Sequence, residues 1–280
     1  MYLISPVGTN LAKSTLCQTI VRTAVNMDKM LWVAMSGAKQ NLMAVSVQAN
    51  NLANVKTVGF KADLVQARSM QAFGEGLPTR VFSMAERPSQ NMSGGTMITT
   101  GRDLDIAIQG DGWMAVEDKN GQEAYTRSGN LQITPEGLLT TSTGQPVIGE
   151  GGPILLPIPV DKIEIGLDGA IVVRPQGAPA NFLEEVDRIK LIKPDNDFDL
   201  DKGNDGLFRP KELDAFAQCG FCEASPDVRI IKGALESSNV NAVTAMVDMV
   251  SLQRQFEMQN KMMKQAEKID QQSDMLMRVF

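Results

Sequence analysis

The chain has 280 residues, of which 43% are apolar and 21% are charged, so it can bury a core and has the composition of an ordinary globular protein. Its net charge of −6 argues against nucleic acid as the main partner, and no apolar run approaches the ~20 residues needed for membrane insertion. The sequence contains no histidine, which is the commonest general acid–base and a common metal ligand. An enzyme is therefore less expected.

Glycine and proline divide the chain into two helical ends and a turn-rich middle. Of the 24 glycines, 21 lie from Gly74 to Gly233, and 12 of the 13 prolines lie from Pro78 to Pro226. Both residues break helices and form turns. We predict an α+β protein whose N- and C-terminal helices pair as a coiled coil, with a central antiparallel all-β domain. The predicted boundaries are a leader at 1–26, a helix and turn at 27–73, a β-rich domain at 74–232 and a helix at 233–280.

Residues 1–26 lack the features of a secretory signal. They have no basic start, no clean apolar core and no small-residue cleavage site. We interpret them as a leader that comes from an upstream start or a non-native extension. The alternative is a genuine extension of the first helix, and mass measurement of the protein from cells would distinguish the two.

A heptad pattern of apolar residues predicts the first helix, from about Met27 to Asn54. Its members are spaced alternately by four and three residues, which is the spacing of a coiled-coil seam. Lys39 is the one charge between Leu31 and Val55, and a helix with so few charges expects neighbours on more than one side. The seam could close a hairpin within the chain or pack against other subunits, and the low charge favours assembly. The seam residues are Leu31, Met35, Ala38, Leu42, Val45, Ala49 and Leu52.

The stretch ANNLANVKTVGFK, residues 49–61, follows the end of this pattern. Asparagine tolerates the left-handed conformation and bonds to its own backbone, so Asn50, Asn51 and Asn54 suit the C-terminus of a helix. Gly59 permits a turn, after which Phe60 can pack against the fold. The residue types of this stretch therefore predict that the helix ends here.

Alternating side chains and turn signals predict successive antiparallel hairpins in the middle of the chain. Three dipeptides that favour hairpin turns interrupt the strands, namely Asp111-Gly112, Asn120-Gly121 and Asp168-Gly169. The first would join residues 104–108 to a strand that opens at Trp113, and the last would join residues 163–167 to 171–173. Such a series is typical of a meandering antiparallel β domain.

Two motifs in the middle resemble ligand-binding loops but lack required residues. In PDNDFDLDKGNDG, a calcium loop that starts at Asp195 would place Leu200 where glycine is required and Gly206 where a bidentate glutamate is required. A start at Asp197 fails in the same way. GQPVIGEGG lacks the Lys-Ser/Thr pair of a phosphate-binding loop. We expect a solvated acidic loop and a plain loop, with no metal and no cofactor.

Cys219 and Cys222 form a CxxC motif. Structural zinc needs four ligands, and the sequence has no second pair and no histidine to supply them. A thioredoxin-like site would lie at a helix start within a βαβ unit, whereas this motif lies in a β region. The expected states are two free thiols or a local disulfide, which is feasible in an oxidising compartment.

A second heptad pattern predicts the C-terminal helix, with Ser238 or Asn239 as its N-cap after Gly233. The pattern has one polar member, Gln259, and this helix carries more charge than the first one. Methionine and alanine are frequent in the seam, and both allow close and adaptable packing. The apolar seam residues are Ala242, Ala245, Met249, Leu252, Phe256, Met263 and Ala266.

These segments resemble the flagellar axial proteins, the rod and hook family of the bacterial flagellum. ANNLANVKTVGFK is similar to the N-terminal signature of that family, and GALESSNVNAVTAMVDMVSLQRQFEMQNKMMK is similar to its closing helix. TGRDLDIAIQGDGW and YTRSGNLQITPEGLLTTSTGQPVIG resemble its central β domain, so the similarity runs from about Met27 to the C-terminus. The signature residues are Asn50, Asn51, Leu52, Ala53, Asn54, Thr57, Gly59 and Phe60.

The resemblance implies a structural subunit of the flagellar basal-body (proximal) rod in the periplasmic space, without enzymatic activity. Its terminal helices would assemble with other rod proteins and copies of itself into the shaft that transmits torque, and its β domain would face outward. Export through the flagellar type III apparatus would explain the missing cleavable signal. Another rod or hook subunit is the alternative within the family. A soluble β-domain binding module or enzyme with a helical clip is the alternative outside it.

Overall fold

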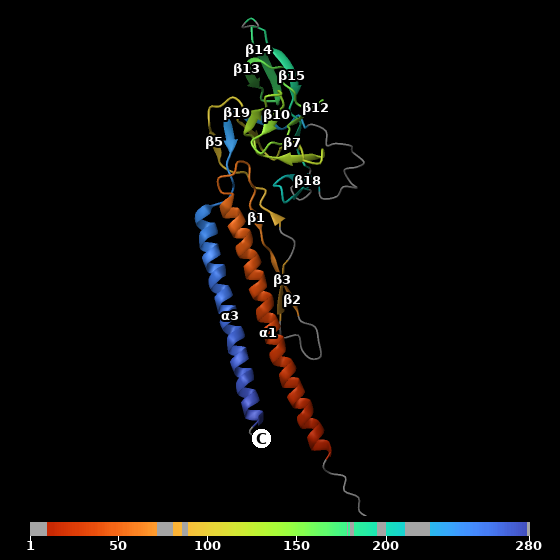
Figure 1. Cartoon of the computed structure of the whole chain (residues 1–280), viewed down its shortest axis with the longest axis vertical. Helices are drawn as coiled ribbons and strands as arrows, with labels where there is room; N and C mark the ends of the chain where they lie inside the picture. Colours follow the sequence, from red (N-terminus) through yellow and green to blue (C-terminus); the bar gives the residue numbers. More distant parts are fainter. Residues whose placement is uncertain are drawn as a thin grey trace, which may run out of the picture. The chain divides into compact units, whose positions relative to one another are not determined.

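The computed structural model describes residues 10–71, 81–85, 89–177, 179, 182–194, 200–210 and 225–278. The chain divides into two compact units, and each combines segments that are separated in the sequence. The first unit contains residues up to 50, 64–89 and 243 onward, and the second contains 51–63 and 90–242. The two long helices belong mainly to the first unit and most strands belong to the second (Figure 1), so the α+β class is confirmed.

The helices are α1 (Asn10–Ala53) and α3 (Ala242–Arg278). The strands are β1 (Asp63–Leu64), β2 (Ala67–Gln71), β3 (Val81–Ala85), β4 (Ser89–Gln90), β5 (Met97–Thr99), β6 (Ile106–Gln109), β7 (Trp113–Glu117), β8 (Glu123–Thr126), β9 (Leu131–Ile133), β10 (Leu139–Thr141), β11 (Ile148–Gly149), β12 (Gly152–Pro153), β13 (Val160–Ile165), β14 (Ala170–Pro175), β15 (Glu184–Arg188), β16 (Leu191–Ile192), β17 (Leu200–Lys202), β18 (Phe208–Pro210), β19 (Arg229–Lys232) and β20 (Ala234–Glu236).

Helix α1 begins at Asn10, earlier than the start predicted at Met27. No glycine or proline occurs from residue 9 to residue 36, so nothing in that stretch interrupts a helix. α1 therefore takes in much of the segment 1–26, whose status stays a prediction. Neither helix, over its described residues, has the length and the apolar content that crossing a membrane requires.

Helix α3 begins at Ala242, so the predicted N-cap at Ser238 or Asn239 is wrong. Both side chains are used in the segment before the helix. Ser238 Oγ accepts a hydrogen bond from the Val240 N–H at 3.2 Å. Asn239 Oδ1 accepts from the Ala62 N–H at 2.8 Å, which ties this segment to the residues that follow α1.

The second unit is built from antiparallel strands. Its largest sheet has the order β16-β7-β8-β18-β17, and a second sheet has the order β13-β14-β15. The hairpin predicted at Asn120-Gly121 is confirmed, because β7 pairs with β8 and the Gly121 N–H donates to the Asp118 carbonyl at 2.9 Å. The hairpin predicted at Asp168-Gly169 is also confirmed, because β13 pairs with β14. Further two-stranded pairs are β9 with β10, β11 with β12, β6 with β19, and β5 with β20.

The hairpin predicted at Asp111-Gly112 is wrong. β6 and β7 flank this dipeptide, but β6 pairs with β19, whereas β7 pairs with β8 and β16. β19 comes far later in the chain, so no local pattern indicates that it takes the place beside β6. Gly112 instead permits a close approach, because a Cβ atom there would lie 2.2 Å from Cγ1 of Val228.

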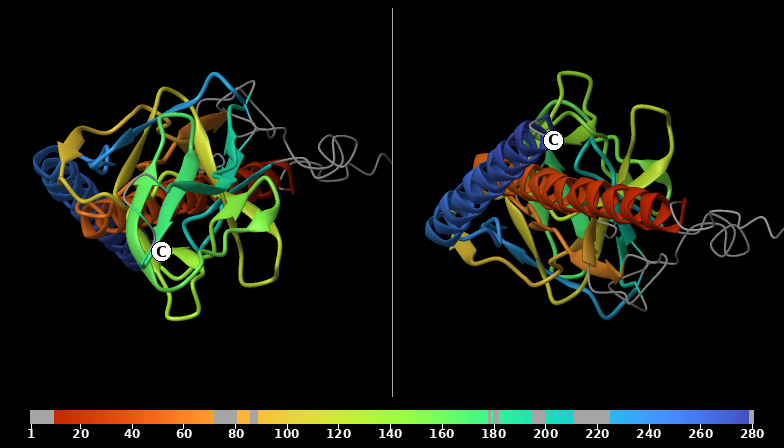
Figure 2. Two further views of the ribbon diagram at one scale, coloured as in Figure 1. Left: turned by 90° about the horizontal axis from the view of Figure 1, so that it is seen from above. Right: turned by 90° about the horizontal axis from the view of Figure 1, so that it is seen from below.

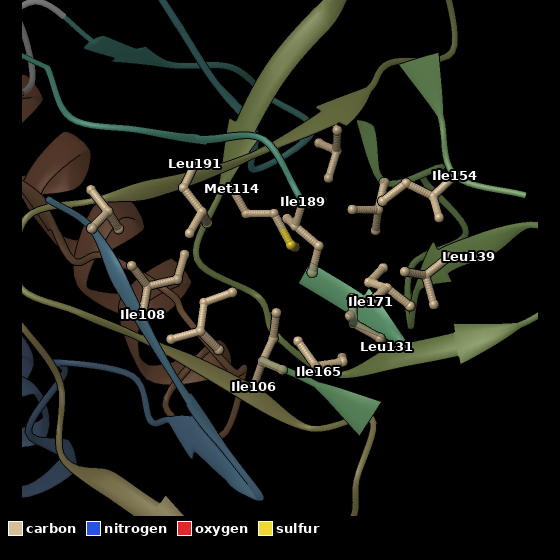
Figure 3. Close-up of a cluster of buried hydrophobic side chains, with 14 of the residues drawn as sticks. Ile106, Ile108, Met114, Leu131, Leu139, Ile154, Ile165, Ile171, Ile189 and Leu191 are labelled. Carbon is tan, nitrogen blue, oxygen red and sulfur yellow. The ribbon is translucent and has the colours of Figure 1, made fainter. Parts of the chain in front are cut away.

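Strand β7 separates two hydrophobic clusters, because successive side chains of a strand point to opposite faces. Met114 and Val116 belong to the larger cluster, and Trp113 belongs to the smaller one, where its ring centroid lies 4.4 Å from that of Phe208. Fully burying a large apolar side chain contributes about 1.5–3 kcal/mol, so these clusters are a main source of the unit's stability. Figure 3 shows the larger cluster, whose buried members include Ile106, Ile108, Leu131, Leu139, Ile154, Ile165, Ile171, Ile189 and Leu191.

Candidate functional site: an ionic latch and the faces of the terminal helices

The signature segment, residues 49–61, ends α1 and turns the chain, as the sequence predicts. Asn51 is buried and holds Asp63 across the turn. Asn51 Nδ2 donates to the Asp63 carbonyl, and the Asp63 N–H donates to Asn51 Oδ1, both at 2.9 Å. Gly59 has a φ of +69°, a left-handed conformation that glycine adopts without steric penalty. The Asn51 side chain therefore holds the two sides of the turn together through two hydrogen bonds.

The other signature residues line the last turn of α1 and the chain after it. Thr57 Oγ1 donates to Asn54 Oδ1 at 3.0 Å within the turn. Half-buried members are Leu52, Asn54 and Phe60, and exposed members are Asn50, Ala53 and Thr57. The segment is therefore held mainly by its buried members and by backbone hydrogen bonds.

Three buried charged side chains in the second unit form a cluster that we call the ionic latch: Lys61, Arg127 and Glu236. Lys61 Nζ lies 2.7 Å from Glu236 Oε1, and Arg127 Nη1 lies 3.1 Å from Glu236 Oε2. The three side chains are 0%, 4% and 1% exposed, respectively.

Further hydrogen bonds satisfy the charged groups of the ionic latch. The Gly95 N–H donates to Glu236 Oε1 at 2.8 Å. Lys61 Nζ donates as well to the carbonyl of Ser93 at 2.9 Å. Such pairing is what makes buried charge tolerable.

The ionic latch joins segments that are far apart in the sequence. Lys61 ends the signature segment, Arg127 follows β8, and Glu236 is the last residue of β20. The backbone reinforces the junction, because the Gly59 N–H donates to the Glu236 carbonyl at 2.8 Å. One glutamate therefore anchors both the chain that leaves α1 and the chain that leads to α3.

Burial and pairing shift the ionisation of the latch in opposite directions. Burial lowers the pKa of Lys61 and the charge of Arg127 lowers it further, while Glu236 offsets part of both effects. Burial by itself raises the pKa of Glu236, but hydrogen bonds from Lys61 and Gly95 and the charge of Arg127 outweigh burial, so this pKa lies below 4.5. Glu236 is thus a carboxylate at neutral pH. Both of its oxygens accept hydrogen bonds from the protein, so the latch holds segments together and does not offer a reacting group to a solute.

Lys202 supports the signature segment from another strand of the same unit. Its Nζ donates to the Lys61 carbonyl at 2.9 Å and lies 3.0 Å from Asp63 Oδ1. The same ammonium lies 3.8 Å from the centroid of the Phe60 ring, a cation–π distance. Phe60 therefore packs against the fold after Gly59, as predicted, and does so beneath a charged group.

On α3, the predicted seam follows the covered side of the helix. Ala245 is buried, and most positions between the seam residues are exposed. The half-buried seam residues are Ala242, Met249, Leu252, Phe256, Met263 and Ala266. Their role in assembly stays a prediction.

On α1, the predicted seam is covered only in part. Ala38 is buried, and Val45 and Leu52 are half-buried. The exposed seam residues are Leu31, Met35, Leu42 and Ala49. Instead, small or polar residues form the most covered positions of α1 within the first unit, namely Ala34, Ala38, Gln40 and Asn41. Large apolar side chains of α1 are therefore left uncovered within the chain.

The two helices contact each other at Gly37 of α1 and Gln259 of α3, where a Cβ atom on the glycine would lie 2.5 Å from the glutamine Nε2. In the right-hand view of Figure 2, seen from below, the two helices cross. Pairing along their whole length as a coiled coil stays a prediction.

Two predicted motifs lie wholly or partly outside the described residues. Cys219 and Cys222 are not among them, so the disulfide stays a prediction. Of the acidic loop, residues 195–199 lie outside, and residues 200–206 form β17 and the turn to β18. Within the described ranges, no three His, Cys, Asp or Glu side chains are grouped closely enough to hold a metal ion.

Sequence reasoning missed the ionic latch, although Lys61 and Glu236 stand inside the two terminal motifs. A single sequence does not reveal whether a charge is buried, and these two residues are 175 positions apart. The one local signal is that Glu236 ends a short strand whose other residues are Ala234 and Leu235. An acid in such a place needs a partner if the strand is buried.

Comparison with known proteins places the whole arrangement among flagellar proteins. Three protein-family models match the chain: flagella basal body rod protein over residues 31–61, flagellar hook protein FlgE/F/G D1 domain over residues 107–173, and flagellar basal body rod FlgEFG protein C-terminal over residues 231–275. The flagellar basal-body rod protein FlgF of Escherichia coli (strain K12) is 43% identical over 235 residues, which cover 84% of this chain and 92% of the relative. FlgF of Salmonella typhimurium is 43% identical with the same coverage of both chains. FlgF of Caulobacter vibrioides is 34% identical over 85% of this chain and 93% of its own.

Proposed function

The chain belongs to the FlgF family of flagellar basal-body rod proteins, and we propose that it builds the rod through the uncovered faces of its two terminal helices. It is a structural subunit of the basal body and associates with other rod components. Its relatives are rod proteins, so a binding module or enzyme with a helical clip is not favoured.

The observation that carries this proposal is the exposure of large apolar side chains on α1. Leu42 is 53% exposed, and Leu31, Trp32, Met35 and Met43 are also exposed. Contiguous apolar surface of this kind marks an interaction site. In the proposed rod, helices of neighbouring subunits and of other rod proteins cover these residues. The subunit lies in the proximal part of the rod, its β-rich unit faces outward, and the assembled rod transmits torque.

The proposed assembly also implies that the terminal helices become rigid only when they meet other subunits. Helices in proteins gain most of their stability from tertiary packing, and helices without such packing are marginal in water. Segments that fold on contact do not polymerise before they meet their partners. We propose that the chain is exported from the cytoplasm through the flagellar type III apparatus in an unfolded state, and that its helices are fully ordered only beside other subunits.

Leu42→Asp tests the proposal, because this exposed residue can be changed without disturbing the core of the chain. We expect Leu42→Asp to fold with wild-type stability yet to be absent from purified basal bodies, with loss of motility. Leu252→Asp, on the half-buried seam of α3, should also prevent incorporation. Leu155→Asp is the matched control, because Leu155 is at least as exposed, 63% against 53% for Leu42, but lies outside both helices. Normal incorporation and motility of Leu42→Asp would contradict the proposal.

A further inference from the structure

Polar atoms without hydrogen-bond partners lie where α1 meets α3. Gln40 and Asn41 of α1 are 7% and 8% exposed, yet Gln40 Nε2 and Asn41 Nδ2 are buried and have no partner within the described structure. On α3, Gln259 Oε1 is buried and also has none. We call Gln40, Asn41 and Gln259 the amide cluster. It offers two donors on one helix and one acceptor on the other.

The contact between Gly37 and Gln259 indicates that the amide cluster lies between the two helices. A Cβ atom at Gly37 would lie 2.5 Å from Gln259 Nε2, so the glutamine amide rests directly on this glycine. Glycine is one of the least favourable residues in a helix interior, and its presence there indicates a packing requirement. Gln40 and Asn41 follow Gly37 by three and four residues, so they lie on the same face one turn further on.

We propose that the amide cluster fixes the register in which α1 pairs with α3 of the same chain. In this register the Gln259 amide lies against Gly37, one turn from Gln40 and Asn41, so reorienting the amide would let its oxygen accept a hydrogen bond from one of these two donors. An apolar heptad seam lacks such discrimination, because sliding by one repeat again places apolar residues opposite apolar residues. A slip of one heptad would move Gln259 away from both donors and remove this possible pairing, so the amides would stay buried without partners, which is unfavourable. Fixing register is also the best-attested role of a buried polar residue in a helical seam.

The register matters for assembly, and in this respect the inference rests on the proposed function. A slip of one heptad moves one helix along the other by about 10 Å. Such a slip would displace the exposed side chains of α1, such as Leu42, from the positions that a neighbouring subunit meets. The amide cluster would therefore set the surface that each subunit presents to the rod.

Cysteine pairs across the two helices can report the register. The chain runs in opposite directions in α1 and α3 (Figure 1), and Gly37 lies against Gln259. We therefore expect Ala34, three residues before Gly37, to lie near Met263, four residues after Gln259. Ala34→Cys with Met263→Cys is the in-register pair. Ala34→Cys with Phe256→Cys or with Asp270→Cys reports a slip of one heptad in either direction. Cys17, Cys219 and Cys222 are replaced by serine throughout. Oxidative cross-linking is measured in purified basal bodies as the ratio of slipped to in-register product.

With Gln259 present, the in-register product should dominate. In Gln259→Leu, the ratio of slipped to in-register product should rise roughly ten-fold or more, because the unpaired amide no longer disfavours the slipped states. Gln255→Leu is the matched control, because Gln255 is an exposed residue one turn earlier on the same helix. Its ratio should stay near that of the parent.

An unchanged ratio in Gln259→Leu would overturn the inference, and so would an equal rise in Gln255→Leu, since added apolar surface would then be the cause. Normal incorporation of Leu42→Asp into basal bodies would instead refute the proposed function. The ratio in Gln259→Leu is read independently of that result, so the two failures are distinguishable.

Discussion

Replacing Lys61 by methionine tests whether the ionic latch holds the second unit together. Lys61→Met keeps the length and most of the volume of the side chain, so lost packing contributes little. Removing one partner of a buried ion pair costs about 3–5 kcal/mol, because the other charge stays buried. Glu236 would keep Arg127 and the Gly95 N–H as partners. We therefore expect the lower end, about 3 kcal/mol, out of the roughly 5–15 kcal/mol typical of a folded domain.

Urea unfolding followed by tryptophan fluorescence measures this loss in the full chain. The chain has two tryptophans, and Trp113 is buried beside the latch with Arg127 5.1 Å from its ring centroid. Trp32 lies on α1, so Trp32→Phe leaves Trp113 as the reporter of the second unit. Lys61→Met should lower the midpoint without changing the slope of the transition, because the surface exposed on unfolding is the same.

Lys56→Met is the matched control, because Lys56 is exposed in the same segment. Its free energy of unfolding should stay within about 0.5 kcal/mol of the wild type. A loss below about 1 kcal/mol in Lys61→Met would refute the reasoning, since the buried carboxylate would then be satisfied without its lysine.

Three further changes test other parts of the chain. Gly59→Ala should cost more than about 2 kcal/mol, because alanine would have to adopt φ +69° with its Cβ 2.4 Å from a backbone carbon; Gly144→Ala, at φ +85° with open space around it, should lose only the conformational part, about 1–2 kcal/mol, in the same urea assay. The wild type and Glu236→Gln should differ in unfolding free energy by the full amount above pH 4.5, and this difference should decrease as the pH falls below 4.5. The reason is that folding lowers the pKa of the Glu236 carboxylate. A constant difference in titrated urea curves would contradict that assignment. Cys219→Ser with Cys222→Ser should leave motility near the wild-type level, and complete loss of rod assembly would show that the CxxC motif has a larger role.

The two seams show how far heptad spacing predicts packing. On α3, charged residues occupy much of the outer surface, so the apolar stripe through Met249 and Phe256 is the obvious face to cover, and it is the half-buried one. α1 carries a single charge between Leu31 and Val55, so several stripes are compatible with a helix face. The structure covers small and polar positions such as Ala34 and Asn41, one residue away from the predicted stripe. Periodicity finds the helix but cannot choose a face when apolar residues occur on several sides and charge is nearly absent.

Strand pairing and buried charge depend on contacts that a local window does not contain. The turns at Asn120-Gly121 and Asp168-Gly169 were predictable, because each joins strands that are adjacent in both sequence and sheet. Asp111-Gly112 carries the same signal, but β19 takes the position beside β6. The ionic latch is subject to the same limit, since Lys61 meets Glu236 only after the sheet has formed.

The ionic latch and the amide cluster address one physical problem in two units of the same chain. A well-packed apolar group could stabilise either place at least as well, because desolvation offsets most of what a buried ion pair gains. Polar groups differ from apolar ones in the penalty for a wrong arrangement. A misplaced β20 would leave Glu236 buried without Lys61 and Arg127. In our proposal a slipped α3 would carry Gln259 out of reach of the Gln40 and Asn41 donors. Buried polar groups therefore select one arrangement among several that an apolar pattern would accept, which is what a subunit of a regular assembly requires.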